Sequence, residues 1–136
     1  MSESQNHIAL VQVAYNYIKE EVHDSCWCLI ECDSATTGRP LKVINGFIPD
    51  VYYCYQGKIV IGEAKTEADF DRRHSQEQYH SYMVEMLSYG ENATMVIAVP
   101  WNCVMTAKNY FRRLKGALGY QGRIIVLNEI GGRFVV

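Results

Sequence analysis

Residues 45–66, NGFIPDVYYCYQGKIVIGEAKT, restrict the possible folds of this chain more than any other stretch. An apolar run at 47–55 and a second at 59–64 are separated by Gln56-Gly57. Two runs rich in β-branched and aromatic residues, joined by a glycine-containing turn, predict a β-hairpin.

Charged residues interrupt this hairpin where a buried sheet would carry apolar ones. Asp50 begins the first strand, and Glu63 and Lys65 close the second. Residues two apart in a strand share a face, so Glu63 and Lys65 are expected to point the same way. Two neighbouring carboxylates repel unless a cation lies between them, and hard oxygen ligands suit Mg²⁺. A lysine beside such a metal can orient or help deprotonate water, which indicates metal-assisted attack on a phosphodiester.

Pro49-Asp50, twelve intervening residues and Glu63-Ala64-Lys65 together resemble the PD-(D/E)xK nuclease signature. This superfamily includes restriction endonucleases and archaeal-type Holliday junction resolvases. The resemblance implies that Asp50 and Glu63 hold Mg²⁺ or Mn²⁺ with help from the Ala64 carbonyl. It also implies that Lys65 positions and activates water, which would leave a 5′-phosphate and a 3′-hydroxyl. The alternative is that Asp50 caps a turn and that Glu63 and Lys65 form an exposed cross-strand charge pair.

The resemblance implies two further site residues, both on predicted helices. Apolar spacing predicts an amphipathic helix at 6–22, with its stripe at Ile8, Val11, Tyr15, Ile18 and Val22. Members of the resembled family commonly carry an additional acid on the first helix. Glu21 beside the stripe is assigned to that role and to a second metal site, with a solvated helix end as the alternative.

A second helix is predicted at 67–90, ended by Gly90. Many members of the resembled group have a glutamine on the helix after the E-x-K strand that helps hold the lysine and the water. The resemblance implies that Gln78 has this role, with Gln76 as the alternative.

The remaining pattern predicts short strands at 26–32 and 41–44, buried strands at 94–99 and 123–127, and a helix at 106–118. A strand, a helix and a strand with short links predict parallel neighbours. The element order becomes αβββαβαβ, an α/β fold with a mixed central sheet flanked by helices, in one domain spanning 1–136. This order is also that of the restriction endonuclease-like core.

The chain has a formal charge of -2, which argues against indiscriminate binding to nucleic acid. Residues 106–123, however, hold five basic residues and no acid. A basic helix in an acidic protein indicates a directed phosphate-binding face, and the alternative is a solvated helix face. The predicted DNA-binding residues are Arg72, Arg73, His74, Lys108, Arg112, Arg113 and Lys115.

Five cysteines lack the C-x-x-C spacing of zinc sites. Buried free thiols are the first interpretation, and a soft metal site formed by Cys26, Cys28, Cys32 and Cys54 is the alternative. No apolar run approaches the ~20 residues that cross a bilayer, and the polar start MSESQNH is not a signal peptide. The sequence therefore predicts a cytoplasmic protein without a membrane partner.

These observations predict a metal-dependent endodeoxyribonuclease, with a junction or a flap as a structure-specific substrate and DNA repair or recombination among its settings. So small a domain has little surface for reading a long duplex site, which favours a homodimer or one subunit of a larger complex. One alternative is a catalytically inactive nucleic-acid-binding or assembly module with the same fold. A small-molecule binder with the acids as an ordinary polar site is the other.

Overall fold

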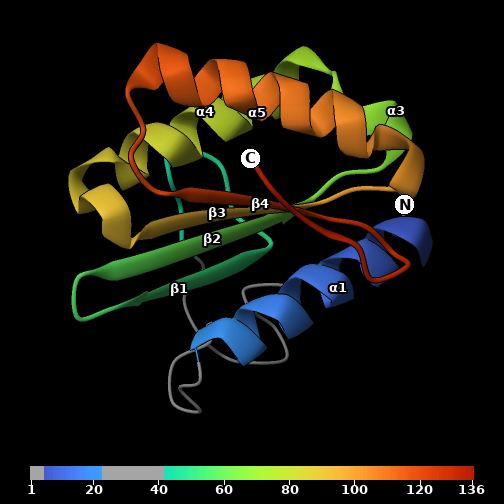
Figure 1. The fold of residues 1–136 in the computed structure, drawn as a ribbon, viewed down its shortest axis with the longest axis horizontal. Helices are drawn as coiled ribbons and strands as arrows, with labels where there is room; N and C mark the ends of the chain where they lie inside the picture. The colour runs from blue at the N-terminus through green and yellow to red at the C-terminus, as the bar shows by residue number, and fades with distance from the viewer. Residues whose placement is uncertain (1–4, 23–41) are drawn as a thin grey trace.

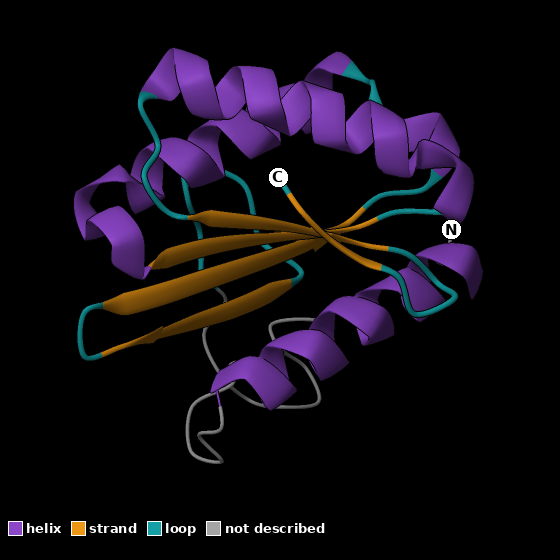
Figure 2. Ribbon diagram, in the orientation of Figure 1, coloured by secondary structure: helices purple, strands orange, loops and turns teal. Residues whose placement is uncertain are grey.

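The computed structural model of this protein describes residues 5–22 and 42–136. These residues form a five-stranded mixed sheet with helices on both faces. The strands lie in the order β1-β2-β3-β4-β5. Helix α1 (Gln5–Val22) covers one face of the sheet, and the other face carries α3 (Glu67–Phe70), α4 (Arg73–Met86) and α5 (Val104–Leu118) (Figures 1 and 2). The predicted α/β class, with a mixed sheet flanked by helices, is confirmed.

The hairpin joins β1 (Val51–Tyr55) to β2 (Lys58–Ala64) in antiparallel pairing, as predicted. Its two-residue turn has positive φ at both positions, 49° at Gln56 and 79° at Gly57. Such turns match the twist of the strands that they connect.

The first strand begins at Val51, one residue after the predicted start at Asp50, and residues 47–50 of the apolar run lie before it. A second tight turn precedes these residues. Asn45 and Gly46 have φ of 52° and 83°, and the backbones of Ile44 and Phe47 exchange hydrogen bonds of 2.8 and 2.9 Å across them. Phe47 therefore pairs with Ile44 and not with β2.

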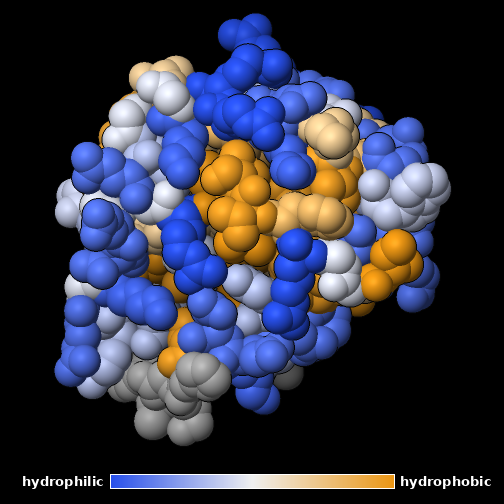
Figure 3. Space-filling model, in the orientation of Figure 1, coloured by the Kyte–Doolittle hydropathy of each residue, from blue (hydrophilic) through white to orange (hydrophobic). Residues whose placement is uncertain are grey.

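Strands β2, β3 (Ala93–Ala98) and β4 (Arg123–Leu127) are parallel neighbours, which confirms the predicted crossover arrangement. The fifth strand, β5 (Arg133–Val135), pairs antiparallel with β4 and is not among the predicted strands. Three residues give too short a pattern to read as a strand. Figure 3 shows apolar side chains gathered where β5 runs, ringed by hydrophilic ones.

The helix predicted at 67–90 is interrupted. Helix α3 ends before Asp71, Arg72 adopts an extended conformation with ψ of 145°, and α4 begins at Arg73. A 3-10 helix, Leu87–Asn92, follows α4. Neither Gly nor Pro marks the break after α3, so the single-helix prediction for this region is wrong for a reason that the local sequence does not reveal.

The buried face of α1 is rotated from the predicted stripe. Its buried residues are Leu10, Ala14, Tyr17 and Ile18, whereas Ile8 is 50% exposed. Only Ile18 belongs to both sets. A Cβ atom at Gly62 would lie 2.7 Å from Ile18 Cδ1, so the glycine lets α1 approach β2 closely.

The strand predicted at 26–32 lies outside the described residues, as do Cys26, Cys28 and Cys32. Of the strand predicted at 41–44, the described part contributes one isolated bridge at Ile44. Among the helices that are described, none combines the length and the apolar character needed to span a membrane.

Candidate active site

Asp50 and Glu63 meet at the open end of the hairpin because of its register. Val51 pairs with Gly62, so the next residues outward are Asp50 and Glu63. The backbone N–H of Asp50 donates to Glu63 Oε1 at 3.3 Å, and the N–H of Ala64 donates to Asp50 Oδ2 at 2.9 Å. Each acid is therefore held by the backbone of the opposite chain segment.

Lys65 completes the cluster from the position just after β2. Its Nζ lies 3.5 Å from Glu63 Oε2 and donates a hydrogen bond to Gln78 Oε1. The residues Glu63 and Lys65 are only 3% and 9% exposed, so the alternative of an exposed charge pair is wrong. We call Asp50, Glu63, Lys65 and Gln78 the hairpin cluster.

Helix α4 matches the spacing of the strand that it covers. Glu63 and Lys65 are two strand residues apart, about 6.6 Å, and one turn of four helical residues rises about 6.0 Å. Gln78 therefore accepts a hydrogen bond from Lys65, while Tyr82, four residues later, lies near Glu63. Gln76 faces away and lines a hollow on the outer side of α4, so the structure favours Gln78 of the two predicted glutamines.

Tyr82 is a residue of the site that sequence reasoning missed. It is fully buried, and its hydroxyl lies close to the Glu63 carboxyl. Burial raises the pKa of this hydroxyl, and the negative charges of Glu63 and Asp50 raise it further. The spacing of four from Gln78 was a signal that could have identified it.

His7 also reaches the cluster without having been predicted. Its Nε2 lies 3.6 Å from Asp50 Oδ2, and the side chains of His7 and Asp50 are 18% and 20% exposed. The contact joins the first turns of α1 to the hairpin. No local spacing in the sequence connects these two residues.

Glu21, the acid assigned to the site by resemblance, is not brought to it. It follows His7 by about 21 Å along the axis of α1, at a rise of 1.5 Å per residue. There it pairs with Arg123, whose Nη1 lies 2.8 Å from Glu21 Oε1. Since the N-terminal part of α1 meets Asp50, an acid at the other end of the helix cannot join the same metal site.

We expect Glu21→Gln to leave any activity of the hairpin cluster unchanged within about twofold. The substitution removes a partly exposed ion pair, which contributes about 0–1 kcal/mol. Activity and thermal melting of Glu21→Gln measured beside Asp50→Asn test this placement. A loss with Glu21→Gln as large as that with Asp50→Asn would contradict it.

Burial dominates the electrostatics of Glu63. It raises the pKa of the carboxyl to about 8, and the charge of Asp50 acts in the same direction. The charge of Lys65 and the hydrogen bond from the Asp50 backbone oppose this rise. Ionisation of Glu63 is costly at this buried position. A divalent cation would stabilise the ionised carboxylate more strongly than Lys65 does.

The donors at this end of the hairpin fit a hard divalent ion. Asp50 and Glu63 supply carboxylate oxygens. The Ala64 N–H points toward Asp50, and because the N–H and C=O of one strand residue lie on the same side, its carbonyl points there too. Oxygen donors of this kind, completed by water, are those that Mg²⁺ and Mn²⁺ accept.

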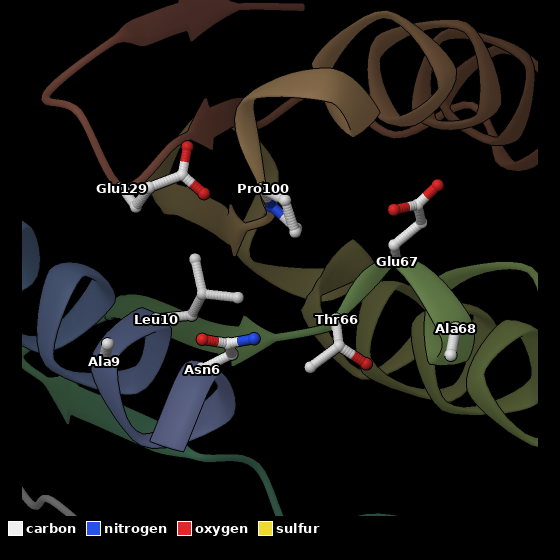
Figure 4. A pocket seen from close by; sticks show the side chains of 8 residues that line it. All are labelled: Asn6, Ala9, Leu10, Thr66, Glu67, Ala68, Pro100 and Glu129. Atoms are coloured by element: carbon white, nitrogen blue, oxygen red, sulfur yellow. The ribbon is translucent and has the colours of Figure 1, made fainter. Parts of the chain in front are cut away.

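A cleft of about 780 Å³ lies beside the cluster, between α1 and the loops that follow β2 and β3 (Figure 4). Asn6, Thr66 and Pro100 line it together with two acids, Glu67 and Glu129. Both acids are held in place: Glu129 Oε1 accepts from the Trp101 N–H at 2.8 Å, and Glu67 Oε2 accepts from the Asn102 side chain at 3.2 Å. No cation lines this cleft among the described residues, so its walls are negative.

The seven predicted DNA-binding residues all lie on the α4 and α5 side of the sheet. Arg72 and Arg73 form ion pairs with Asp69 and Glu77, at 3.4 and 3.3 Å. The remaining five make local contacts or face outward: His74 packs on Phe47, Lys108 lies over Phe134, Arg112 bonds Asn109, and Arg113 and Lys115 extend from α5.

Of the cysteines, Cys54 and Cys103 are described as free thiols, and Cys54 Sγ lies 3.4 Å from the Tyr89 hydroxyl. The alternative metal site of four cysteines includes three that lie outside the described residues.

No protein-family model, curated protein or solved structure matches this chain. The likeness to PD-(D/E)xK nucleases therefore depends on the residues of the hairpin cluster and on their geometry.

Proposed function

We propose that this chain is a metal-dependent nuclease of the PD-(D/E)xK type that hydrolyses DNA phosphodiester bonds. One observation carries the proposal: a hairpin holds Asp50 against Glu63, and beside them a buried Lys65 is bonded to Gln78. A lysine and an acid that are both buried are costly to stability, and catalytic sites are where such costs are found.

Each residue of the cluster has a defined task in this proposal. Asp50, Glu63 and the Ala64 carbonyl would hold Mg²⁺ or Mn²⁺. When bound, the ion supplies Lewis-acid polarisation of the phosphate and a lowered pKa for bound water. The ammonium of Lys65 positions the attacking water and offsets negative charge that develops on the phosphate oxygens. Gln78 fixes the direction of the ammonium by accepting its hydrogen bond.

Cleavage of DNA tests the proposal. Supercoiled plasmid and labelled linear, flapped and branched DNA are incubated with Mg²⁺, Mn²⁺ or EDTA. The wild type is expected to cut only with metal, and Asp50→Asn is expected to lose at least about 100-fold. Asp71→Asn, which changes an exposed acid outside the cluster, serves as the matched control and should cut like the wild type. Linear plasmid formed without a nicked intermediate would support a homodimer that cuts both strands.

Metal-independent cutting, or equal cutting by the wild type and Asp50→Asn, would contradict the proposal. Binding of DNA and metal without any cutting would instead favour the inactive binding or assembly module.

We expect Gln78→Ala to reduce the cleavage rate by about 10–100-fold, the usual cost of removing a residue that orients a catalytic group. Gln76→Ala, two residues away on the outer side of α4, should have less than about a twofold effect on the chemical step. Single-turnover cleavage at saturating DNA measures both. The reverse order of effects would assign the orienting role to Gln76.

A further inference from the structure

A hollow of about 620 Å³ lies on the outer side of α4, between the turn at residues 45–47 and Tyr110 of α5. We infer that this α4–α5 hollow binds an unpaired nucleotide of the substrate strand within a few nucleotides of the cleaved phosphate. The inference rests on the proposed function and deepens it, because it names single-stranded or branched DNA as the substrate class.

Contacts within the protein already hold the side chains that line the hollow. The side chain of Asn45 donates to Ser81 Oγ at 3.0 Å, which ties the turn to α4. The ring of Phe47 packs edge-on against His74, with centroids 5.3 Å apart. Across the hollow, Tyr110 packs against Tyr79 at 5.5 Å. Rings held in this way lose little conformational entropy when a base stacks on them.

The chemistry of the lining suits a nucleotide. Phe47 and Tyr110 offer aromatic surface, while the amides of Asn45 and Gln76 offer both donors and acceptors to base edges. Arg73 supplies a guanidinium that pairs well with phosphate. Proteins that hold single strands combine the same elements, aromatic stacking and cations beside the backbone.

Charge distinguishes this hollow from the larger cleft. The cleft carries Glu67 and Glu129 without a cation, whereas the hollow carries Arg73 against the single acid Glu77. Burial raises the pKa of the Tyr110 hydroxyl, and the nearby positive charge of Arg113 opposes this rise. Arg73 and Glu77 pair at 3.3 Å and leave the lining of the hollow neutral, so a polyanionic strand is repelled less over α4 than along the negative cleft.

The hollow is also within reach of the cluster. Phe47 precedes Asp50 by three residues, so their Cα atoms are at most about 10 Å apart. An unpaired strand does not keep the spacing of a stacked duplex, so this distance spans only a few nucleotides. A base in a duplex is stacked and paired and cannot enter such a hollow, so the nucleotide that binds must be unpaired.

Binding without cleavage tests the inference. A labelled oligothymidylate of about ten nucleotides is titrated in EDTA, and fluorescence anisotropy reports the affinity. Arg73→Ala should weaken binding about threefold or more and lower the slope of log K against log salt by about 0.7. Glu77→Gln removes the acid that competes for Arg73, so it should tighten binding about 2–5-fold.

Phe47→Leu keeps an apolar side chain but loses the stacking ring, and it should weaken single-strand binding about tenfold. The same substitution should leave binding of a blunt duplex unchanged within about twofold. Lys19→Ala, which removes an exposed charge from α1 on the opposite face, is the matched control and should change neither affinity by more than about twofold.

Opposite shifts for Arg73→Ala and Glu77→Gln support the hollow even if Phe47→Leu is unstable. Unchanged affinities for both, or equal losses of single strand and duplex with Phe47→Leu, would overturn it. Because no step requires cutting, the two proposals fail separately. Cutting by the wild type with no effect in the hollow rejects only this inference, whereas the expected shifts without cutting reject only the nuclease.

Discussion

Glu63→Gln is expected to stabilise the metal-free protein at alkaline pH while it abolishes cleavage. Burial and Asp50 raise the pKa of Glu63 from 4.5 to about 8. The folded state therefore binds a proton that the unfolded state has released, and stability falls as pH rises from about 4.5 to about 8. Glutamine never ionises, so the free energy of unfolding of the variant should exceed that of the wild type by about 2–4 kcal/mol near pH 8.

Denaturant unfolding in EDTA across this pH range measures the effect. Glu85→Gln, an exposed acid on α4, is the control and should keep the pH dependence of the wild type. Added Mn²⁺ should stabilise the wild type, because ligands that bind only the folded state do so, and should not stabilise Glu63→Gln. A wild type whose stability is flat or rises over this window would show that Glu63 is already ionised without metal.

Lys65→Met is expected to reduce cleavage by at least about 1,000-fold while metal binding persists. Oriented cationic donors at a developing charge contribute factors of about 100–1,000 each, and Lys65 has the further task of positioning water. Methionine fills a similar volume, so the buried pocket between Glu63 and Gln78 remains packed. Lys65→Arg should not restore activity, because the planar guanidinium is wider than an ammonium.

Single-turnover cleavage and calorimetric Mn²⁺ titration separate the two effects. Lys58→Met changes a half-buried lysine at the other end of β2 and should cut normally. Loss of metal binding in Lys65→Met would mean that Lys65 acts on the ligands, and wild-type cleavage by this variant would remove Lys65 from the mechanism.

The core of the candidate site was predictable because it is local in sequence. Turn chemistry at Gln56-Gly57 and strand periodicity determine which residues face Asp50, so Asp50, Glu63 and Lys65 could be grouped from the sequence. Gln78 required the resemblance, although helical spacing alone puts Tyr82 on the same face of α4 as Gln78.

The features of the site that could not be predicted from the sequence depend on contacts between segments that are distant along the chain. The approach of His7 to Asp50 and the pairing of Glu21 with Arg123 are set by where α1 crosses the sheet. That crossing depends on the rotation of the helix, and several rotations fit an apolar pattern as broad as that of α1. The break before α4 likewise has no Gly or Pro to mark it.

Diffraction from crystals soaked in Mn²⁺, with an anomalous map, tests the central claim most directly. The account predicts a metal peak at the site that the carboxylates of Asp50 and Glu63 and the Ala64 carbonyl would form. The same map from Glu63→Gln should lack the peak. A wild-type crystal with Mn²⁺ bound elsewhere and none between these two acids would contradict the account.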